Sequence, residues 1–204
     1  MCYIIFNSAM SLDGRVGKKG EEIGFLNRLE NYRIHKLRGS VDAIMLDVSS
    51  VISNDPEINV RGSSKEPYRV VVDDKGEIPV DSKILKGEGR KIVVVSKSAK
   101  RGNIRNLEDS GIEVITTGEY AVNLPELMDR LQRMGIDKVL VEGGGSLIRR
   151  LLNEGFINEI YITVSPVLIG EGAKLFDRLD KKVKLALDGI TQYGDQVVLH
   201  YLVK

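Results

Sequence analysis

The sequence predicts one α/β domain over residues 1–204, with a mixed, mostly parallel sheet, flanking helices and a C-terminal antiparallel hairpin. Two observations support this prediction. From residue 3 to residue 155, apolar β-branched runs alternate with segments that are apolar at helical spacing, which is the order of parallel βαβ units. After that, Val183 to Tyr193 and Gln196 to Val203 flank the turn signal Gly194-Asp195. A sheet that begins with parallel crossovers and closes with a hairpin is mixed.

Each expected element follows from its own pattern. Short β-branched runs bounded by Gly, Pro, Asn or Asp predict strands, and apolar positions three or four residues apart predict helices. Strands are expected at Tyr3 to Ala9, Val41 to Leu46, Arg69 to Val72, Lys91 to Val95, Ile112 to Thr116, Lys138 to Val141 and, half-buried, Asn158 to Pro166. Helices are expected at Leu26 to Leu37, Asp47 to Ser53, Ser98 to Asp109, Asn123 or Leu124 to Met134, and Leu147 to Leu152.

Composition excludes several classes of function. A formal net charge of +1 gives no overall basic field for nucleic acid, so any anion site must be local. One cysteine, Cys2, rules out a disulfide framework and fits a reducing compartment such as the cytoplasm. No apolar run approaches the roughly 18 residues of a membrane span. Two histidines and one cysteine without close ligand spacing do not predict a metal site.

The stretch from Lys138 to Leu152 has the order strand, glycine turn, helix. An acid, Glu142, ends the strand, and the glycines at 143–145 lead through Ser146 into the helix. Helix N-termini present unpaired N–H groups, and glycine lets the backbone approach a diphosphate closely. Ser146 either caps the helix or donates to a phosphate oxygen. The spacing is not G-x-G-x-x-G, and a tight turn with a solvated glutamate explains the pattern equally well.

Polar side chains near other expected element ends each have two interpretations. Asp13 is either a substrate contact or the carboxylate of the Asp13-Gly14 turn. Arg38, at a helix end, and Arg61, in a polar loop, are either phosphate ligands or solvated cations. Ser49 and Ser50, at a helix start, are either caps or hydroxyl donors for a ligand. Taken alone, the patterns favour the structural interpretation for Asp13 and Arg38.

A series of short motifs occurs in the order found in one enzyme family. They are Met10-Ser11-Leu12-Asp13-Gly14-Arg15, Leu37-Arg38, Val41-Asp42-Ala43-Ile44-Met45, Asn54-Asp55-Pro56, Val60-Arg61, Arg69-Val70-Val71-Val72-Asp73, Val141-Glu142-Gly143-Gly144-Gly145-Ser146-Leu147 and Ser165-Pro166-Val167-Leu168-Ile169-Gly170. Through them, nearly the whole chain resembles the riboflavin-pathway pyrimidine reductases. That family includes stand-alone archaeal and fungal enzymes and the reductase half of the bacterial deaminase–reductase.

The resemblance implies a dihydrofolate-reductase-like fold, a homodimer, and NADPH as the hydride donor, with NADH as the other possible cofactor. The implied substrate is 2,5-diamino-6-ribosylamino-4(3H)-pyrimidinone 5′-phosphate, whose ribosyl group is reduced to a ribityl group. No deaminase zinc motif precedes the domain, so the stand-alone type is the closer match. The sugar must open so that its C1′ becomes electrophilic, and the protein supplies mainly orientation.

The resemblance also implies roles for individual residues, carried over position by position. The cofactor diphosphate is expected on Gly143, Gly144, Gly145 and Ser146, and the rest of the cofactor groove on Ser50, Asn54, Val72, Asp73, Asp74 and Thr116. The substrate is expected on Asp13, Arg38, Arg61 and Glu142, with Glu142 as the catalytic residue next to the reacting centre. A guanidinium is the natural partner of the 5′-phosphate.

Several residues depart from the family pattern. A glycine-rich turn ending in threonine is replaced here by Asp47-Val48-Ser49-Ser50, Asn54 stands where an aspartate is usual, and Asp74 replaces a small polar residue. Carboxylates near a phosphorylated cofactor repel it, so the departures leave the choice between NADPH and NADH open. Two alternatives also stay open: another nicotinamide-dependent reductase on the same fold, and a paralogue that binds a nucleotide without reducing anything.

Overall fold

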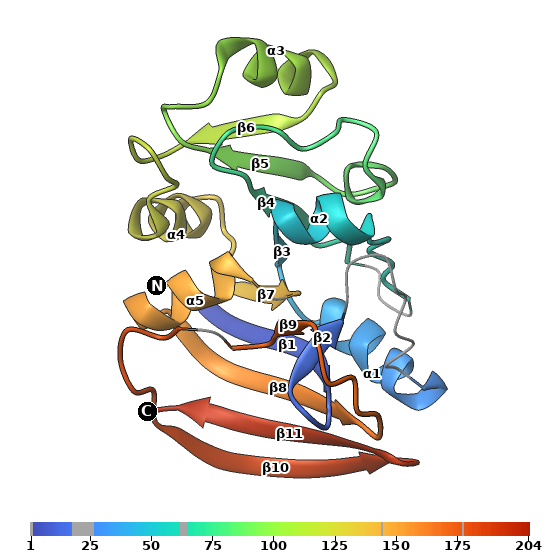
Figure 1. Ribbon diagram of the computed structural model, residues 1–204. Coiled ribbons are helices and arrows are strands. Elements are labelled where there is room, and N and C mark those ends of the chain that lie inside the picture. Colours follow the sequence, from blue (N-terminus) through green and yellow to red (C-terminus); the bar gives the residue numbers. More distant parts are fainter. Residues whose placement is uncertain (1, 18–26, 62–64, 144, 177) are drawn as a thin grey trace.

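The computed structural model of the protein describes residues 2–17, 27–61, 65–143, 145–176 and 178–204. Among these residues a nine-stranded sheet runs in the order β10-β11-β8-β1-β7-β3-β4-β5-β6 (Figure 1). Its strands are β1 Tyr3–Ser11, β3 Ala43–Asp47, β4 Tyr68–Val72, β5 Lys91–Val95, β6 Glu113–Thr116, β7 Lys138–Glu142, β8 Ile157–Ser165, β10 Leu185–Tyr193 and β11 Gln196–Val203.

The sheet is mixed and mostly parallel, which confirms the fold class predicted from the alternation of elements. The strands from β8 through β1, β7, β3, β4 and β5 to β6 pair in parallel. At the other edge, β11 pairs antiparallel with β8, and β10 pairs antiparallel with β11. The predicted C-terminal hairpin is therefore confirmed, and it extends the sheet rather than forming a separate layer.

Helices cover both faces of the sheet because its central strands are apolar on both sides (Figure 1). Successive residues of β1 point to opposite faces, so Phe6 belongs to one buried cluster and Ile5 to the other. α4 and α5 pack leucines into the first cluster, whereas α2 and α3 contribute Val51 and Leu107 to the second. The helices are α1 Arg28–Arg38, α2 Val48–Asn54, α3 Arg101–Asp109, α4 Leu124–Arg133 and α5 Ser146–Glu154.

Two helix starts differ from the sequence prediction by more than one residue. The helix expected from Ser98 begins at Arg101, because the backbone N–H of Ser98 donates to the Ser96 hydroxyl and holds this segment in a turn. α1 begins at Arg28 with Asn27 as its N-cap, and the residue expected as its start lies outside the described ranges. No helix in the described part of the chain is long and apolar enough to cross a membrane.

The structure also contains short elements that the sequence patterns did not predict. β2 (Arg15–Gly17) and β9 (Ala173–Lys174) form a two-stranded sheet, and a short 3₁₀ helix spans Lys83–Leu85. Elements of two or three residues show no periodicity, so they lack the signal on which sequence prediction rests. The small sheet ties the segment after β1 to the segment after β8.

The topology brings two strand–helix units together at the carboxyl edge of the sheet. β3 and β7 are parallel neighbours, with Met45 paired with Val141. α2 follows β3 directly, and α5 follows β7 after a short turn. Ligands of open α/β sheets bind at this edge, which directs the search for a site to the ends of β3 and β7.

Candidate active site

The turn between β7 and α5 depends on two glycines. Gly143 has φ +93° and Gly145 has φ +84°, a region that residues with a Cβ rarely adopt. A Cβ on Gly143 would lie 2.9 Å from Ser50 Oγ, so the turn packs directly against α2. Gly145 is the N-cap of α5, which starts at Ser146, and it has no side chain with which to cap the helix. Gly144 lies outside the described residues, so its contact with a phosphate stays a prediction.

The start of α2 faces this turn. Asp47 is the N-cap of α2, and its Oδ1 accepts the backbone N–H of Ser49 at 2.8 Å. A Cβ on Gly145 would lie 3.6 Å from Ser49 Oγ. The hydroxyls of Ser49 and Ser50 therefore lie against the glycine turn. Because helix N-termini carry unpaired N–H groups and partial positive charge, their convergence favours an anionic ligand.

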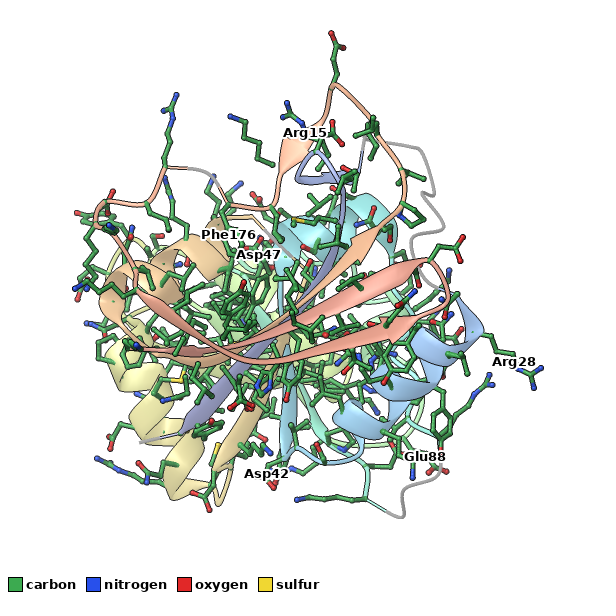
Figure 2. All side chains as sticks on the ribbon, turned by 90° about the horizontal axis from the view of Figure 1, so that it is seen from below. Arg15, Arg28, Asp42, Asp47, Glu88 and Phe176 are labelled. Carbon is green, nitrogen blue, oxygen red and sulfur yellow. The ribbon has the colours of Figure 1, made fainter. Side chains whose placement is uncertain are left out.

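Asp47 links the two helices in a way that the sequence patterns did not predict. Its Oδ2 accepts the hydroxyl of Ser146 at 2.7 Å and the backbone N–H of Leu147 at 3.1 Å. The Asp47 side chain is in the interior of the molecule, where the residue is 6% exposed (Figure 2). Of the two roles considered for Ser146, helix cap or phosphate donor, the structure shows neither, because its hydroxyl donates to Asp47.

A cavity of about 340 Å³ opens beside the turn. Gly145 and Ser146, at the start of α5, line it together with Phe176. Two exposed cationic side chains, Arg149 and Lys174, also line it. Cations and helix N–H groups around one cavity provide the electrostatic setting for a phosphorylated ligand.

Glu142, at the end of β7, forms a two-point ion pair with Arg38. The Nε atom of Arg38 donates to Oε1 at 2.8 Å and its Nη2 donates to Oε2 at 2.7 Å. Nη1 donates to the carbonyl of Asn59 at 3.1 Å. Burial alone would lower the pKa of Arg38, but attraction and hydrogen bonding to Glu142 outweigh burial, and the pKa is raised. The guanidinium predicted to bind substrate therefore holds the carboxylate predicted to be catalytic.

A second, smaller cavity of about 160 Å³ lies in front of this ion pair. Glu142, Arg38 and Gly143 line it together with the polar side chains of Asn7 and Thr163. Gly143 belongs to this cavity and Gly145 to the larger one, so the glycine turn separates the two.

A buried network under the small cavity was not predicted from the sequence. Glu30 is fully buried and accepts the hydroxyl of Thr163 at 2.5 Å. Arg33 donates to both carboxylate oxygens of Glu30, at 2.7 and 2.8 Å, and to Asn7 Oδ1 at 2.6 Å. The available signal was an acid and a base three residues apart on an amphipathic helix, a pattern that usually marks a solvated pair. The network fixes the orientation of Asn7 and Thr163.

Asp13, predicted to contact substrate, connects two loops. Its carboxylate accepts the hydroxyl of Ser11 at 2.6 Å and the backbone N–H groups of Ile169 and Gly170 at 3.1 and 2.8 Å. The Ser11 hydrogen bond and then that from Ile169 lower the pKa of Asp13 to about 2. The structure does not place Asp13 in the wall of the Glu142 cavity, and a contact with substrate stays a prediction.

The residues predicted at the end of β4 are held by internal contacts. The Val72 side chain lies in the core, at 3% exposure. The buried Asp73 carboxylate accepts the backbone N–H of Ile78 at 2.7 Å, and burial raises its pKa. Asp74 Oδ1 accepts the N–H of Val122 at 2.7 Å and lies 3.5 Å from Arg150 Nη1. Asp74 therefore has a cationic neighbour on α5 and does not simply point to solvent.

Three other predicted residues line neither of the two cavities. Asn54 ends α2 and is exposed, and Arg61 is exposed in the loop that follows. Thr116 ends β6, four strands from β7 in the sheet order, or roughly 19 Å at the usual spacing. The structure brings Ser50, Glu142, Gly143, Gly145, Ser146 and Arg38 into one site. Roles for Asn54, Arg61 and Thr116 stay predictions.

Comparison with known proteins gives consistent matches. The family model described as the RibD C-terminal domain matches residues 2–199. A protein named 2,5-diamino-6-ribosylamino-4(3H)-pyrimidinone 5′-phosphate reductase from Methanothermobacter thermautotrophicus is 29% identical, covering 99% of this chain and 98% of the relative. A protein of the same name from Archaeoglobus fulgidus is 34% identical and covers 82% of each. A solved structure of RibD from Acinetobacter baumannii superposes with a TM-score of 0.83 at 25% identity, and this chain spans 58% of its length.

We predict that Gly143→Ala destabilises the protein more than Gly135→Ala. Both glycines have positive φ, but a Cβ at Gly135 meets nothing within 4 Å, whereas one at Gly143 meets Ser50 Oγ. Backbone strain costs about 1–2 kcal/mol at either position, and the contact adds about 1 kcal/mol at Gly143. Denaturant unfolding of both variants measures the difference. Adding Ser50→Ala should restore part of the loss at Gly143 only, and equal losses without restoration would contradict the packing described here.

Proposed function

The chain belongs to the RibD C-terminal domain family, and we propose that it reduces 2,5-diamino-6-ribosylamino-4(3H)-pyrimidinone 5′-phosphate in riboflavin biosynthesis. The reaction would convert the ribosyl group into a ribityl group. Support comes from the names of relatives that match this chain over most of both lengths. The observation that carries the proposal is the position of the Glu142–Arg38 pair, which lines the small cavity beside the glycine turn. We expect the enzyme in the cytoplasm, where its free cysteine, Cys2, stays reduced.

The residues around the larger cavity fit a nicotinamide dinucleotide, and we propose NADPH, with NADH as the alternative. A bound nicotinamide cofactor supplies the hydride. The turn at Gly143 and Gly145 would hold the diphosphate through backbone N–H groups, with the hydroxyls of Ser49 and Ser50 beside it. Arg149 and Lys174 offer compensating positive charge. The Ser146 hydroxyl would contribute less to diphosphate binding than the sequence predicts, because it already donates to Asp47.

The small cavity would hold the sugar end of the substrate. Glu142 accepts two charge-assisted hydrogen bonds from Arg38, so its carboxylate cannot rotate freely. Its remaining lone pairs can accept hydrogen bonds from hydroxyl groups of the opened sugar. These bonds would orient the carbon that is reduced. Asn7 and Thr163, fixed by the buried network, offer further polar groups. Since Arg38 is used in holding Glu142, Arg61 is the better candidate for the 5′-phosphate.

A hydride-transfer assay tests the proposal. With the ribosylaminopyrimidine phosphate present, the chain should oxidise NADPH, followed as loss of its absorbance. Glu142→Gln should lower kcat/KM at least 100-fold while NADPH binding is retained, because the reacting sugar loses its charged acceptor. Glu119→Gln, at an exposed surface pair with Lys97, is the matched control and should leave the rate unchanged. Tight nucleotide binding without any turnover would instead favour the paralogue that does not reduce a substrate.

Cofactor choice is predicted to depend on Asp74 and Arg150. We propose that both lie near the adenosine ribose, where Asp74 disfavours the 2′-phosphate of NADPH and Arg150 favours it. Asp74→Ser should then raise the ratio of kcat/KM for NADPH over that for NADH about tenfold, or ~1.4 kcal/mol. Arg150→Gln should shift the ratio the other way. Steady-state kinetics with both cofactors provide the measurement, and unchanged ratios in both variants would remove this pair from the cofactor site.

We propose that the chain forms a homodimer through the edge that β10 provides. An edge strand has unpaired backbone groups, and this one also exposes Leu187 (54%) and Ile190 (61%). Sedimentation equilibrium at micromolar concentration should therefore return a dimer. Ile190→Lys should shift the equilibrium toward monomer. Val80→Lys, at an exposed apolar residue outside the hairpin, should have no effect, and a monomeric parent chain would refute the proposal.

A further inference from the structure

Asp47 is a buried carboxylate at the point where two helices begin. Its Oδ1 accepts the N–H of Ser49 in α2, and its Oδ2 accepts the hydroxyl of Ser146 and the N–H of Leu147 in α5. An N-cap aspartate normally satisfies only its own helix. Here one side chain caps both helices, because Gly145 leaves α5 without a side-chain cap of its own. An internal anion therefore already occupies the position that a phosphate would favour.

We propose that Asp47 competes with the diphosphate of the cofactor and thereby sets a low affinity for dinucleotides; this inference rests on the proposed function. Two donors of the turn, the Ser146 hydroxyl and the Leu147 N–H, are already used by Asp47. A diphosphate must rely on the other N–H groups of the turn. It also lies close to a carboxylate of the same sign of charge, in a buried setting where salt screens little.

Competition at the diphosphate predicts a specific pattern of affinities. NADPH, NADH and adenosine diphosphate ribose all contain the diphosphate, so Asp47 should weaken the three to the same extent. Asp74, placed near the ribose, should instead separate NADPH from NADH. A residue that only stabilises the fold would change none of the three affinities once the protein is folded.

The test is the variant Asp47→Asn, compared with the parent chain by equilibrium titration. Asparagine is similar in shape, and its single carbonyl oxygen can still accept from Ser146 and Leu147, at the cost of the hydrogen bond from the Ser49 N–H. All three ligands should bind about tenfold more tightly, without any dependence on turnover. Asp47→Ser provides a second neutral variant, since serine also caps helices well and keeps α2 in place.

Asp42 offers a matched control at the other end of β3. Its carboxylate accepts the backbone N–H groups of Asp137 and Lys138 at 2.9 and 2.7 Å, so it also ties β3 to β7. Asp42 and Asp47 lie well apart in the molecule (Figure 2). Asp42→Asn should lower the melting temperature and leave the three affinities unchanged. Asp47→Asn should lower the melting temperature of the free protein too, yet gain more stabilisation from each ligand.

Two outcomes would overturn the inference in different ways. If the parent chain binds none of the three ligands, the proposed function fails, and the inference fails with it. If the parent binds them but both Asp47 variants bind with equal or lower affinity, only the inference fails, and Asp47 is a structural cap. The competition is supported if either neutral Asp47 variant binds all three ligands more tightly than the parent. Asp42→Asn should bind all three with the affinity of the parent.

Discussion

The parallel pairing of β3 with β7 is the constraint on which the site depends. Parallel strands end at the same edge, so this pairing starts α2 and α5 side by side. Both strands have buried side chains on both faces, and a slip of one residue would exchange those faces. The same slip would separate Asp47 from Ser146 and Glu142 from Arg38. The packing of the core therefore fixes the geometry of the polar groups at the edge.

The Glu142–Arg38 ion pair joins the end of β7 to α1 and holds the Glu142 carboxylate in place. Both side chains are largely buried, at 10% and 14% exposure, so loss of either partner leaves a buried charge without compensation. Such a loss costs about 3–5 kcal/mol in other proteins, far more than an exposed pair contributes. Arg38 ends α1, so the pair also anchors that helix to the sheet. The position of α1 and that of the carboxylate that we propose to be catalytic therefore depend on the same contact.

Sequence periodicity was sufficient for the strands of the large sheet and for the α-helices, because each is apolar at its own repeat, but not for β2, β9 and the 3₁₀ helix, which are too short to show one. Periodicity could not predict which polar side chains bond to each other. Arg38 and Glu142 are 104 residues apart, and Asp47 and Ser146 are 99 apart. No local pattern connects such pairs, so Arg38 was predicted as a phosphate ligand and Asp47 only as a departure. The buried Glu30 network was missed for a different reason, because Glu30 and Arg33 form an i,i+3 pair, a spacing that usually marks a solvated pair.

The charge balance at the glycine turn explains how one aspartate can serve stability and oppose binding. Two like charges about 5 Å apart at an effective dielectric near 20 repel by roughly 3 kcal/mol. The two helix N-termini offset about 0.3–1 kcal/mol each, and the exposed cations Arg149 and Lys174 offset little more because solvent screens them. The repulsion that remains weakens diphosphate binding without preventing it, because the free N–H groups of the turn can still donate to the phosphates. Against this, capping contributes about 1 kcal/mol for each of two helices, so Asp47 stabilises the protein at the expense of affinity.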